Sequence, residues 1–176
     1  MKQFGLLRLS LLCVVCALSG SIARGQAASA QNAPTTAAQL ELIGATGEHV
    51  NISMVNFHAL PQKTVEVHNA HTGATETYQG VELSLLLTRV DAPLGQKLHG
   101  KALAMYVVAE GTDKYRVVYS LAEIDPAFHN GTVIVADREA GQPITKDGPF
   151  KLVNTDDKRP ARWVRNLSSI QLSSSP

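Results

Sequence analysis

Short runs in which apolar residues alternate with polar ones, or cluster together, cover most of this chain and predict β-strands. Residues 39–43 and 49–52 flank a glycine-containing turn at 44–47, which predicts a β-hairpin. Further runs rich in strand-forming residues lie at 63–67, 75–79, 102–109, 115–121 and 132–136. We therefore expect a fold built mainly from short strands.

Helical signals are short and few. Apolar residues at 81–90 have helical spacing and predict a buried helix. Ser53 can cap a helix at 54–60, and Ser120 with Glu123 three positions later matches a capping box. Strands interrupted by short helices without regular alternation predict an α+β fold with a mixed sheet. Closely spaced glycine turns favour a folded or barrel-like sheet, and they lie at Gly111, Gly131, Gly141 and Gly148.

The first 30 residues have the pattern of a secretory signal peptide. Lys2 and Arg8 precede an apolar run at 9–18, and small residues follow at 28–30. That run is too short to span a bilayer, so we expect no membrane span after cleavage and a periplasmic or secreted product; an uncleaved anchor is the alternative. The remaining chain is predicted to comprise a flexible tether at 31–38, a single domain at 39–172 and a frayed tail at 173–176.

Removal of the leader changes both the thiol content and the charge. Cys13 and Cys16 are the only cysteines, so the mature chain has neither a disulfide nor a cysteine-ligated metal. The leader also holds three of the 16 basic residues and none of the 15 acidic ones, which leaves a net charge of −2. This balance argues against nucleic-acid binding, which needs a strong basic excess.

Positive charge is nevertheless concentrated near the C-terminus. Six basic residues fall within twenty positions: Lys146, Lys151, Lys158, Arg159, Arg162 and Arg165. Lys151, Arg162 and Arg165 could form an anion pocket with Trp163 as a flat wall. The alternative is that they pair with Asp147, Asp156 and Asp157 on a solvated face.

No metal site is predicted from the histidines. His68 and His71 lie three apart beside a strand end, where they would share a metal only if a turn intervenes, with His58 or His49 as a third ligand. Surface histidines are the alternative. Carboxylates at turns and helix ends are typical of caps, and the chain lacks a nucleophile elbow, a phosphate loop and a dinucleotide fingerprint.

Several short blocks nevertheless occur in a recognisable order. They are Gly80-Val81-x-Leu83-x-x-Leu86-Leu87, Tyr115-x-x-x-Tyr119-Ser120-Leu121-x-Glu123, residues 133–137, Gly141-x-Pro143-Ile144, residues 148–153 and Arg162-x-Val164-Arg165-x-Leu167-x-x-Ile170. Together this series, within residues 65–172, resembles the molybdopterin-binding domain of sulfite-oxidase-like oxidoreductases. The resemblance implies that family's fold.

The resemblance also implies a position for the cofactor metal. In that family one cysteine thiolate, placed after a strand, binds the molybdenum of a molybdenum–pterin cofactor. The corresponding position here is Asn69, or His68 if the alignment shifts by one, and neither side chain is a soft anionic ligand. We therefore expect a domain without cysteine-ligated molybdenum chemistry.

The part of the resemblance that concerns the pterin phosphate is better matched. Lys151 corresponds to a family arginine after the Gly-Pro turn, and Arg165 corresponds to a family lysine. Both positions are cationic, as a phosphate requires. The family's polar pterin contact falls near Asp147. The same C-terminal block includes Arg162, Trp163 and Val164.

These observations predict an exported domain that binds an anionic small molecule of the pterin phosphate type, with molybdopterin or a related pterin as the implied cofactor. One alternative is a molybdenum oxidoreductase with a non-cysteine metal site. Another is a cofactor-free module that binds a periplasmic protein partner. Larger members of the family carry a dimerisation domain after this region. Because this short chain does not include one, a monomer is expected.

Overall fold

The computed structural model describes residues 38–174. The predicted signal peptide, nearly all of the tether and the last two residues therefore lie outside the described part of the chain. Within that part, no helix is long and apolar enough to cross a membrane.

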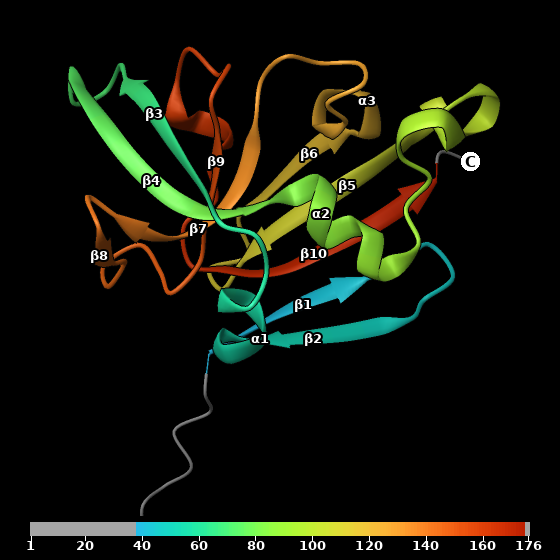
Figure 1. Cartoon of the computed structure of the whole chain (residues 1–176), viewed down its shortest axis with the longest axis horizontal. Helices are drawn as coiled ribbons and strands as arrows, with labels where there is room; N and C mark the ends of the chain where they lie inside the picture. Colours follow the sequence, from blue (N-terminus) through green and yellow to red (C-terminus); the bar gives the residue numbers. More distant parts are fainter. Residues whose placement is uncertain (1–37, 175–176) are drawn as a thin grey trace, which may run out of the picture. The chain divides into compact units, whose positions relative to one another are not determined.

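The first sheet brings together strands from both ends of the described chain (Figure 1). Its order is β2 (His49–Ser53), β1 (Gln39–Ile43), β10 (Leu167–Ser174), β5 (Met105–Gly111) and β6 (Arg116–Ser120). The β1–β10 pair is parallel and the other pairs are antiparallel. The last strand thus lies in the centre of the sheet.

The second sheet contains the strands that surround the candidate site. Its path is β3 (Lys63–Asn69), β4 (Ala74–Glu82), β7 (Val133–Glu139) and β8 (Gln142–Pro143), while β9 (Lys151–Asn154) pairs with the first half of β7. All of these pairings are antiparallel. One mixed and one antiparallel sheet, connected by short helices, confirm the predicted α+β class.

Short helices connect the strands. They are α1 (Met54–His58), α2 (Leu83–Leu87), η1 (Thr88–Val90), η2 (Gly95–Lys97), η3 (Gly100–Ala104), α3 (Leu121–Ile124) and η4 (Pro160–Arg162). The capping box predicted at Ser120 and Glu123 is present at the start of α3. The helix predicted at 81–90 begins only at Leu83, because residues 81 and 82 still pair with β7.

Two other expected boundaries also differ from the structure. The strand expected at 102–109 begins at Met105, because residues 100–104 form a 3₁₀ helix. The turn expected at Gly141 consists of Ala140 and Gly141, which both have positive φ, and residues 142–143 already pair with β7. Such a two-residue turn matches the twist of a hairpin.

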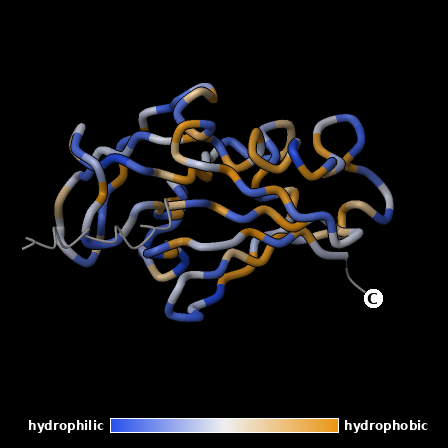
Figure 2. Tube along the Cα trace, turned by 90° about the horizontal axis from the view of Figure 1, so that it is seen from below, coloured by the Kyte–Doolittle hydropathy of each residue, from blue (hydrophilic) through white to orange (hydrophobic). Residues whose placement is uncertain are grey.

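The main hydrophobic core lies where the two sheets meet. It contains fully buried residues of both sheets and of the helices, including Leu40, Val81, Leu86, Val107 and Val135. Figure 2 shows hydrophobic and hydrophilic positions alternating along neighbouring strands. This alternation is the pattern expected for sheets with one face in a core.

The opposite face of the second sheet is also covered. Val65, Val67, Tyr78, Ile134, Ala136, Ile144, Val153 and Trp163 form a smaller cluster there. Strand β7 therefore has one row of side chains in each cluster, which explains why residues 133–136 are all buried. Trp163 packs edge-on against Tyr78, with ring centroids 5.9 Å apart.

A β-bulge in β7 changes which residues face this smaller cluster. Gly80 pairs with Ala136 and Gln79 pairs with Arg138, so Asp137 is an extra residue. Tyr78 consequently lies opposite Glu139; without the extra residue, Arg138 would occupy that position. A glycine is required at residue 80, where a Cβ would lie 1.9 Å from the Val135 carbonyl oxygen.

Candidate functional site

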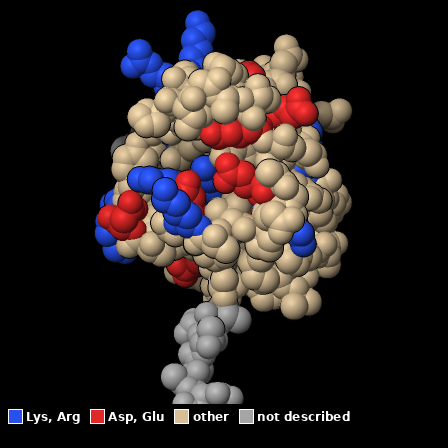
Figure 3. Space-filling view, turned by 90° about the vertical axis from the view of Figure 1, so that its left-hand side faces the viewer, with Lys and Arg blue, Asp and Glu red and all other residues tan. Residues whose placement is uncertain are grey.

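A cavity of about 540 Å³ opens at the end of the second sheet. Its walls come from the β3–β4 hairpin, the β5–β6 turn, the end of β7, the segment before β9 and residues 160–165. Figure 3 views the molecule from the side of this hairpin and β8, and shows acidic and basic side chains gathered around a hollow. Ligand cavities of this size are typical of small-molecule sites.

Lys151 lies in the wall of this cavity and is 6% exposed. Its ammonium donates hydrogen bonds to Tyr78 Oη at 2.8 Å and to Asp147 Oδ2 at 3.1 Å. The ring centroids of Tyr78 and Trp163 lie 4.8 and 5.8 Å from Nζ. These contacts offset part of the cost of removing an ammonium from water.

Strand pairing determines where Lys151 points. Residue 151 pairs with Ala136 of β7, a residue of the smaller cluster, and the preceding Phe150 is buried in the main core. Because successive side chains of a strand point to opposite faces, Lys151 is directed toward the smaller cluster and the cavity. The local sequence Phe-Lys-Leu-Val thus places one cation among otherwise buried apolar residues.

Arg165 faces the same cavity from the loop before β10. Its Nη1 lies 3.9 Å from Asp147 Oδ1, and its side chain is 64% exposed. The backbone N–H of Asn166 donates to the Asp147 carbonyl oxygen at 2.7 Å, which holds the two loops together. The structure therefore brings four predicted site residues to one cavity, namely Asp147, Lys151, Trp163 and Arg165.

Tyr78, Glu76 and Glu139 complete the polar wall of the cavity, and sequence reasoning missed all three. The Tyr78 hydroxyl lies 2.8 Å from Glu76 Oε2 and 3.2 Å from Glu139 Oε1. Burial, together with these two carboxylates, raises the pKa of Tyr78 above its ordinary value. The hydroxyl therefore stays protonated and donates to a carboxylate while it accepts from Lys151.

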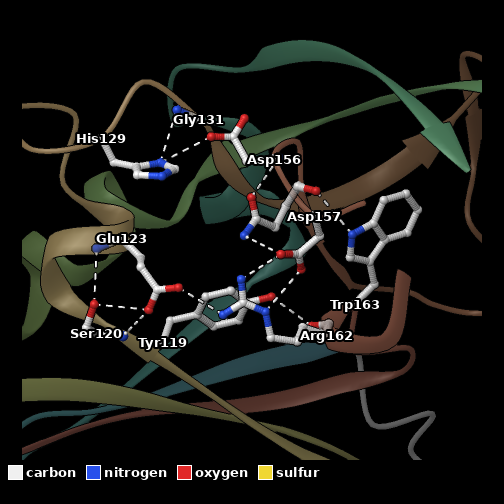
Figure 4. Close-up of polar contacts among 10 residues, drawn as sticks. Tyr119, Ser120, Glu123, His129, Gly131, Asp156, Asp157, Arg162 and Trp163 are labelled. Carbon is white, nitrogen blue, oxygen red and sulfur yellow. Dashed lines mark hydrogen bonds and ion pairs between the residues drawn. The ribbon is translucent and has the colours of Figure 1, made fainter. Parts of the chain in front are cut away.

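Arg162 belongs to a different cluster, shown in Figure 4. It donates to Asp157 Oδ1 at 2.6 Å and to Glu123 Oε1 at 2.9 Å, and its guanidinium lies 4.5 Å from the Tyr119 ring centroid. The hydrogen bond to Asp157 raises the pKa of Arg162. Burial raises the pKa of Glu123, but hydrogen bonds from Arg162 and Ser120 outweigh it and leave that pKa below its ordinary value.

Val164 also lies outside the residues that line the cavity. Its side chain is fully buried in the main core, and its carbonyl oxygen accepts a hydrogen bond from the Leu152 N–H at 2.8 Å. The predicted C-terminal block is therefore divided between three places: Trp163 and Arg165 reach the cavity, Val164 enters the core, and Arg162 forms the separate ion-pair cluster.

The position that the resemblance assigns to the metal-binding cysteine does lie at the cavity. Asn69 is 9% exposed and lines it, together with His71. Its amide donates to Glu76 Oε1 at 2.8 Å and accepts from the His71 backbone N–H at 2.9 Å. His68 is exposed on β3.

A thiolate-held molybdenum does not fit these residues. The Asn69 side chain is neutral, and both ends of its amide are already hydrogen-bonded. His58 and His49, considered as further ligands, instead contact Asp137 and Glu41, each at 2.8 Å. Across residues 38–174, no group of three His, Cys, Asp or Glu side chains is arranged to hold a metal ion.

Comparisons with known proteins show the fold. The chain matches no model of a known protein family, and no curated protein sequence matches it. A solved structure that it resembles is the sulfane dehydrogenase SoxCD from Paracoccus pantotrophus, with a TM-score of 0.59 and 16% sequence identity. The match covers 78% of this chain and 38% of that one. This likeness shows that the chain shares its fold with part of that dehydrogenase, in agreement with the expected α+β fold.

Proposed function

We propose that this exported domain binds an anionic small molecule, of the pterin phosphate type, in the cavity that Lys151 lines. The buried ammonium of Lys151 is the observation that carries the proposal. A lysine is rarely buried, and this one is paired with Asp147 while its side chain still lines a cavity. Arg165 and Lys146 line the same cavity and add positive charge at its mouth.

The hydrogen bonds of Lys151 leave room for a ligand. An ammonium has three N–H donors. Among residues 38–174, its hydrogen-bond acceptors are Tyr78 and Asp147, which leaves one N–H for an acceptor atom supplied by a ligand. A charge-assisted hydrogen bond from a buried cation is stronger than one between neutral groups.

The aromatic residues suit a flat ligand. Tyr115 is 47% exposed at the cavity wall, and Trp163, which is almost fully buried, also lines the cavity. A heterocycle placed against Tyr115 would keep its polar edge toward the carboxylates and Lys151. This arrangement supports a pterin-like group over an aliphatic anion, and the distant fold similarity is consistent with it.

The proposal predicts the effect of removing the ammonium. Lys151→Met keeps most of the side-chain volume but removes the charge, and we expect it to weaken the binding of pterin-6-carboxylate at least tenfold, or about 1.5–3 kcal/mol. Quenching of pterin fluorescence measures the affinity. Lys101→Met, which removes an exposed lysine in η3, is the matched control and should bind like the natural protein.

Equal affinities for the natural protein and the Lys151→Met variant would contradict the proposal, provided that both have the same far-ultraviolet circular dichroism. That result would favour the cofactor-free interaction module. Molybdenum that copurifies in stoichiometric amount with the natural protein would instead favour the oxidoreductase alternative, with a metal site not formed by cysteine.

A further inference from the structure

Two carboxylates that line the cavity, those of Glu76 and Glu139, lie within hydrogen-bond distance of the same tyrosine hydroxyl. Tyr78 has a single hydroxyl proton, yet its oxygen lies within hydrogen-bond distance of both Glu76 and Glu139. At any moment, one of these two carboxylates receives no hydrogen bond from the tyrosine. The structure thus contains an acceptor that faces the cavity and lacks a constant donor.

Glu76 and Glu139 differ in how firmly they are held. Glu76 Oε1 also accepts from Asn69 Nδ2 at 2.8 Å and from Thr72 Oγ1 at 3.1 Å, so that its carboxylate is fixed. For Glu139, the described residues supply a side-chain hydrogen bond only from Tyr78. Of these two carboxylates, Glu139 therefore has more capacity for a new N–H donor.

Cationic and acidic groups meet at the Tyr78 hydroxyl. The oxygen lies 2.8 Å from Lys151 Nζ and 2.8 Å from Glu76 Oε2, so the ammonium and the carboxylates are within the reach of one small molecule. Lys151 is only 6% exposed and has one N–H left for an acceptor. Glu139 has oxygen atoms left for a donor. These are independent observations, and each points to a ligand group of opposite character.

Simple ions of either sign fit the cavity poorly. A purely anionic ligand that reaches Lys151 also approaches Asp147, Glu76 and Glu139, and like charges at short range repel. A purely cationic ligand that reaches Glu139 meets Lys151. A ligand that carries both an anionic group and an N–H donor can place the anion at Lys151 and the donor at Glu139, and so avoids both repulsions.

We infer that the ligand of this cavity carries an anionic group and an N–H donor group in the same small molecule. The anionic group binds Lys151 and Arg165, and the N–H donor binds the Glu76–Glu139 pair. The inference rests on the proposed function, because it concerns the same cavity, and it adds a second point of recognition. Glu139 is a specificity-determining residue in this arrangement.

Four probes test the inference on the natural protein by titration calorimetry. Inorganic phosphate supplies only the anion, and ethanolamine supplies only the donor. Phosphoethanolamine and pterin-6-carboxylate supply both groups, on an aliphatic and on a flat framework. We expect at least one of the two-group probes to bind tenfold or more tightly than either phosphate or ethanolamine.

A charge-neutralising variant identifies the second point of recognition. Glu139→Gln keeps the side-chain shape but presents an amide, so we expect it to lower the affinity of the preferred two-group probe about tenfold and to leave that of phosphate equal or higher. Glu66→Gln, the same change at an exposed position of β3, is the control and should leave all four affinities unchanged. Circular dichroism checks that both variants are folded.

The outcomes separate this inference from the proposed function. If phosphate binds as tightly as both two-group probes, or if Glu139→Gln leaves their advantage intact, the second recognition point is wrong while anion binding stands. If none of the four probes binds, or if Lys151→Met changes none of the affinities, both proposals fail.

Discussion

At the scale of single residues, the cavity depends on a hydroxyl that serves several charged groups. The Tyr78 hydroxyl accepts a hydrogen bond from Lys151 of β9. It donates one either to Glu76 of its own strand, β4, or to Glu139 of β7. Its ring is fully buried, so that the hydroxyl is held rigidly at the cavity wall. Networks of this kind stabilise a protein only when every member has a partner.

Removal of that hydroxyl should therefore be costly. We expect Tyr78→Phe to lower the free energy of unfolding by about 1–3 kcal/mol, because Lys151 loses the buried one of its two acceptors. Urea unfolding measures the change. The Tyr78→Phe/Lys151→Met double variant should lose less than the sum of the two single changes, since no buried donor then lacks its partner. Strictly additive losses would show that the two side chains act independently.

At the scale of elements, the bulge in β7 determines the chemistry of the site. The extra residue Asp137 places Glu139 rather than Arg138 opposite Tyr78. It also presents Asp137 to His58 of α1, at 2.8 Å between Oδ2 and Nε2. Strands β4 and β7 approach so closely at the bulge that residue 80 has no space for a side chain.

Gly80→Ala tests this close approach. The new Cβ would lie 1.9 Å from a backbone oxygen of β7, which cannot move without a shift of the strand. We expect a loss of about 3 kcal/mol or more, or failure to fold. Gly131→Ala is the matched control, because the atoms nearest to its Cβ would be those of the Asp156 carboxylate, which can rotate away. Equal thermal midpoints for the two variants would contradict this account of the bulge.

At the scale of the whole described unit, an ion-pair cluster connects segments that are distant in sequence. Arg162 of η4 joins Glu123 of α3 to Asp157 of the loop after β9. This cluster also contacts the first sheet, because the Arg162 guanidinium lies over the ring of Tyr119 in β6. It therefore holds residues 155–162, which form the approach to Trp163 and Arg165, against α3.

The cluster predicts an acid-dependent part of the stability. The pKa of Glu123 is lower in the folded protein than its ordinary value, so its carboxylate favours folding above the unfolded-state pKa, and this contribution is lost as the pH falls through the folded-state pKa. We expect Glu123→Gln to cost about 1 kcal/mol or less at neutral pH, because the pair is partly exposed, and to cost little at about pH 3. Urea midpoints at both pH values measure the effect, with Glu66→Gln as the control. A cost that does not change with pH would indicate lost packing instead of lost charge.

Much of the fold follows from local sequence. The strand positions, the capping box of α3 and the cationic character of residues 151 and 165 are legible from the pattern, because alternation and capping depend on neighbours within a few residues. The absence of cysteine beyond residue 16 is equally a property of the sequence alone. These features predicted the α+β class and part of the cavity.

Only the tertiary structure determined which residues far apart in the chain contact each other. A bulge is a property of two strands together, so the sequence of β7 alone does not reveal that Glu139 meets Tyr78. The 3₁₀ turn at Pro160–Arg162 likewise directs Arg162 to Glu123, while Trp163 and Arg165 reach the cavity. Local sequence thus set the character of each side chain, whereas long-range strand register set its partners, because one residue of slip exchanges the two faces of a strand.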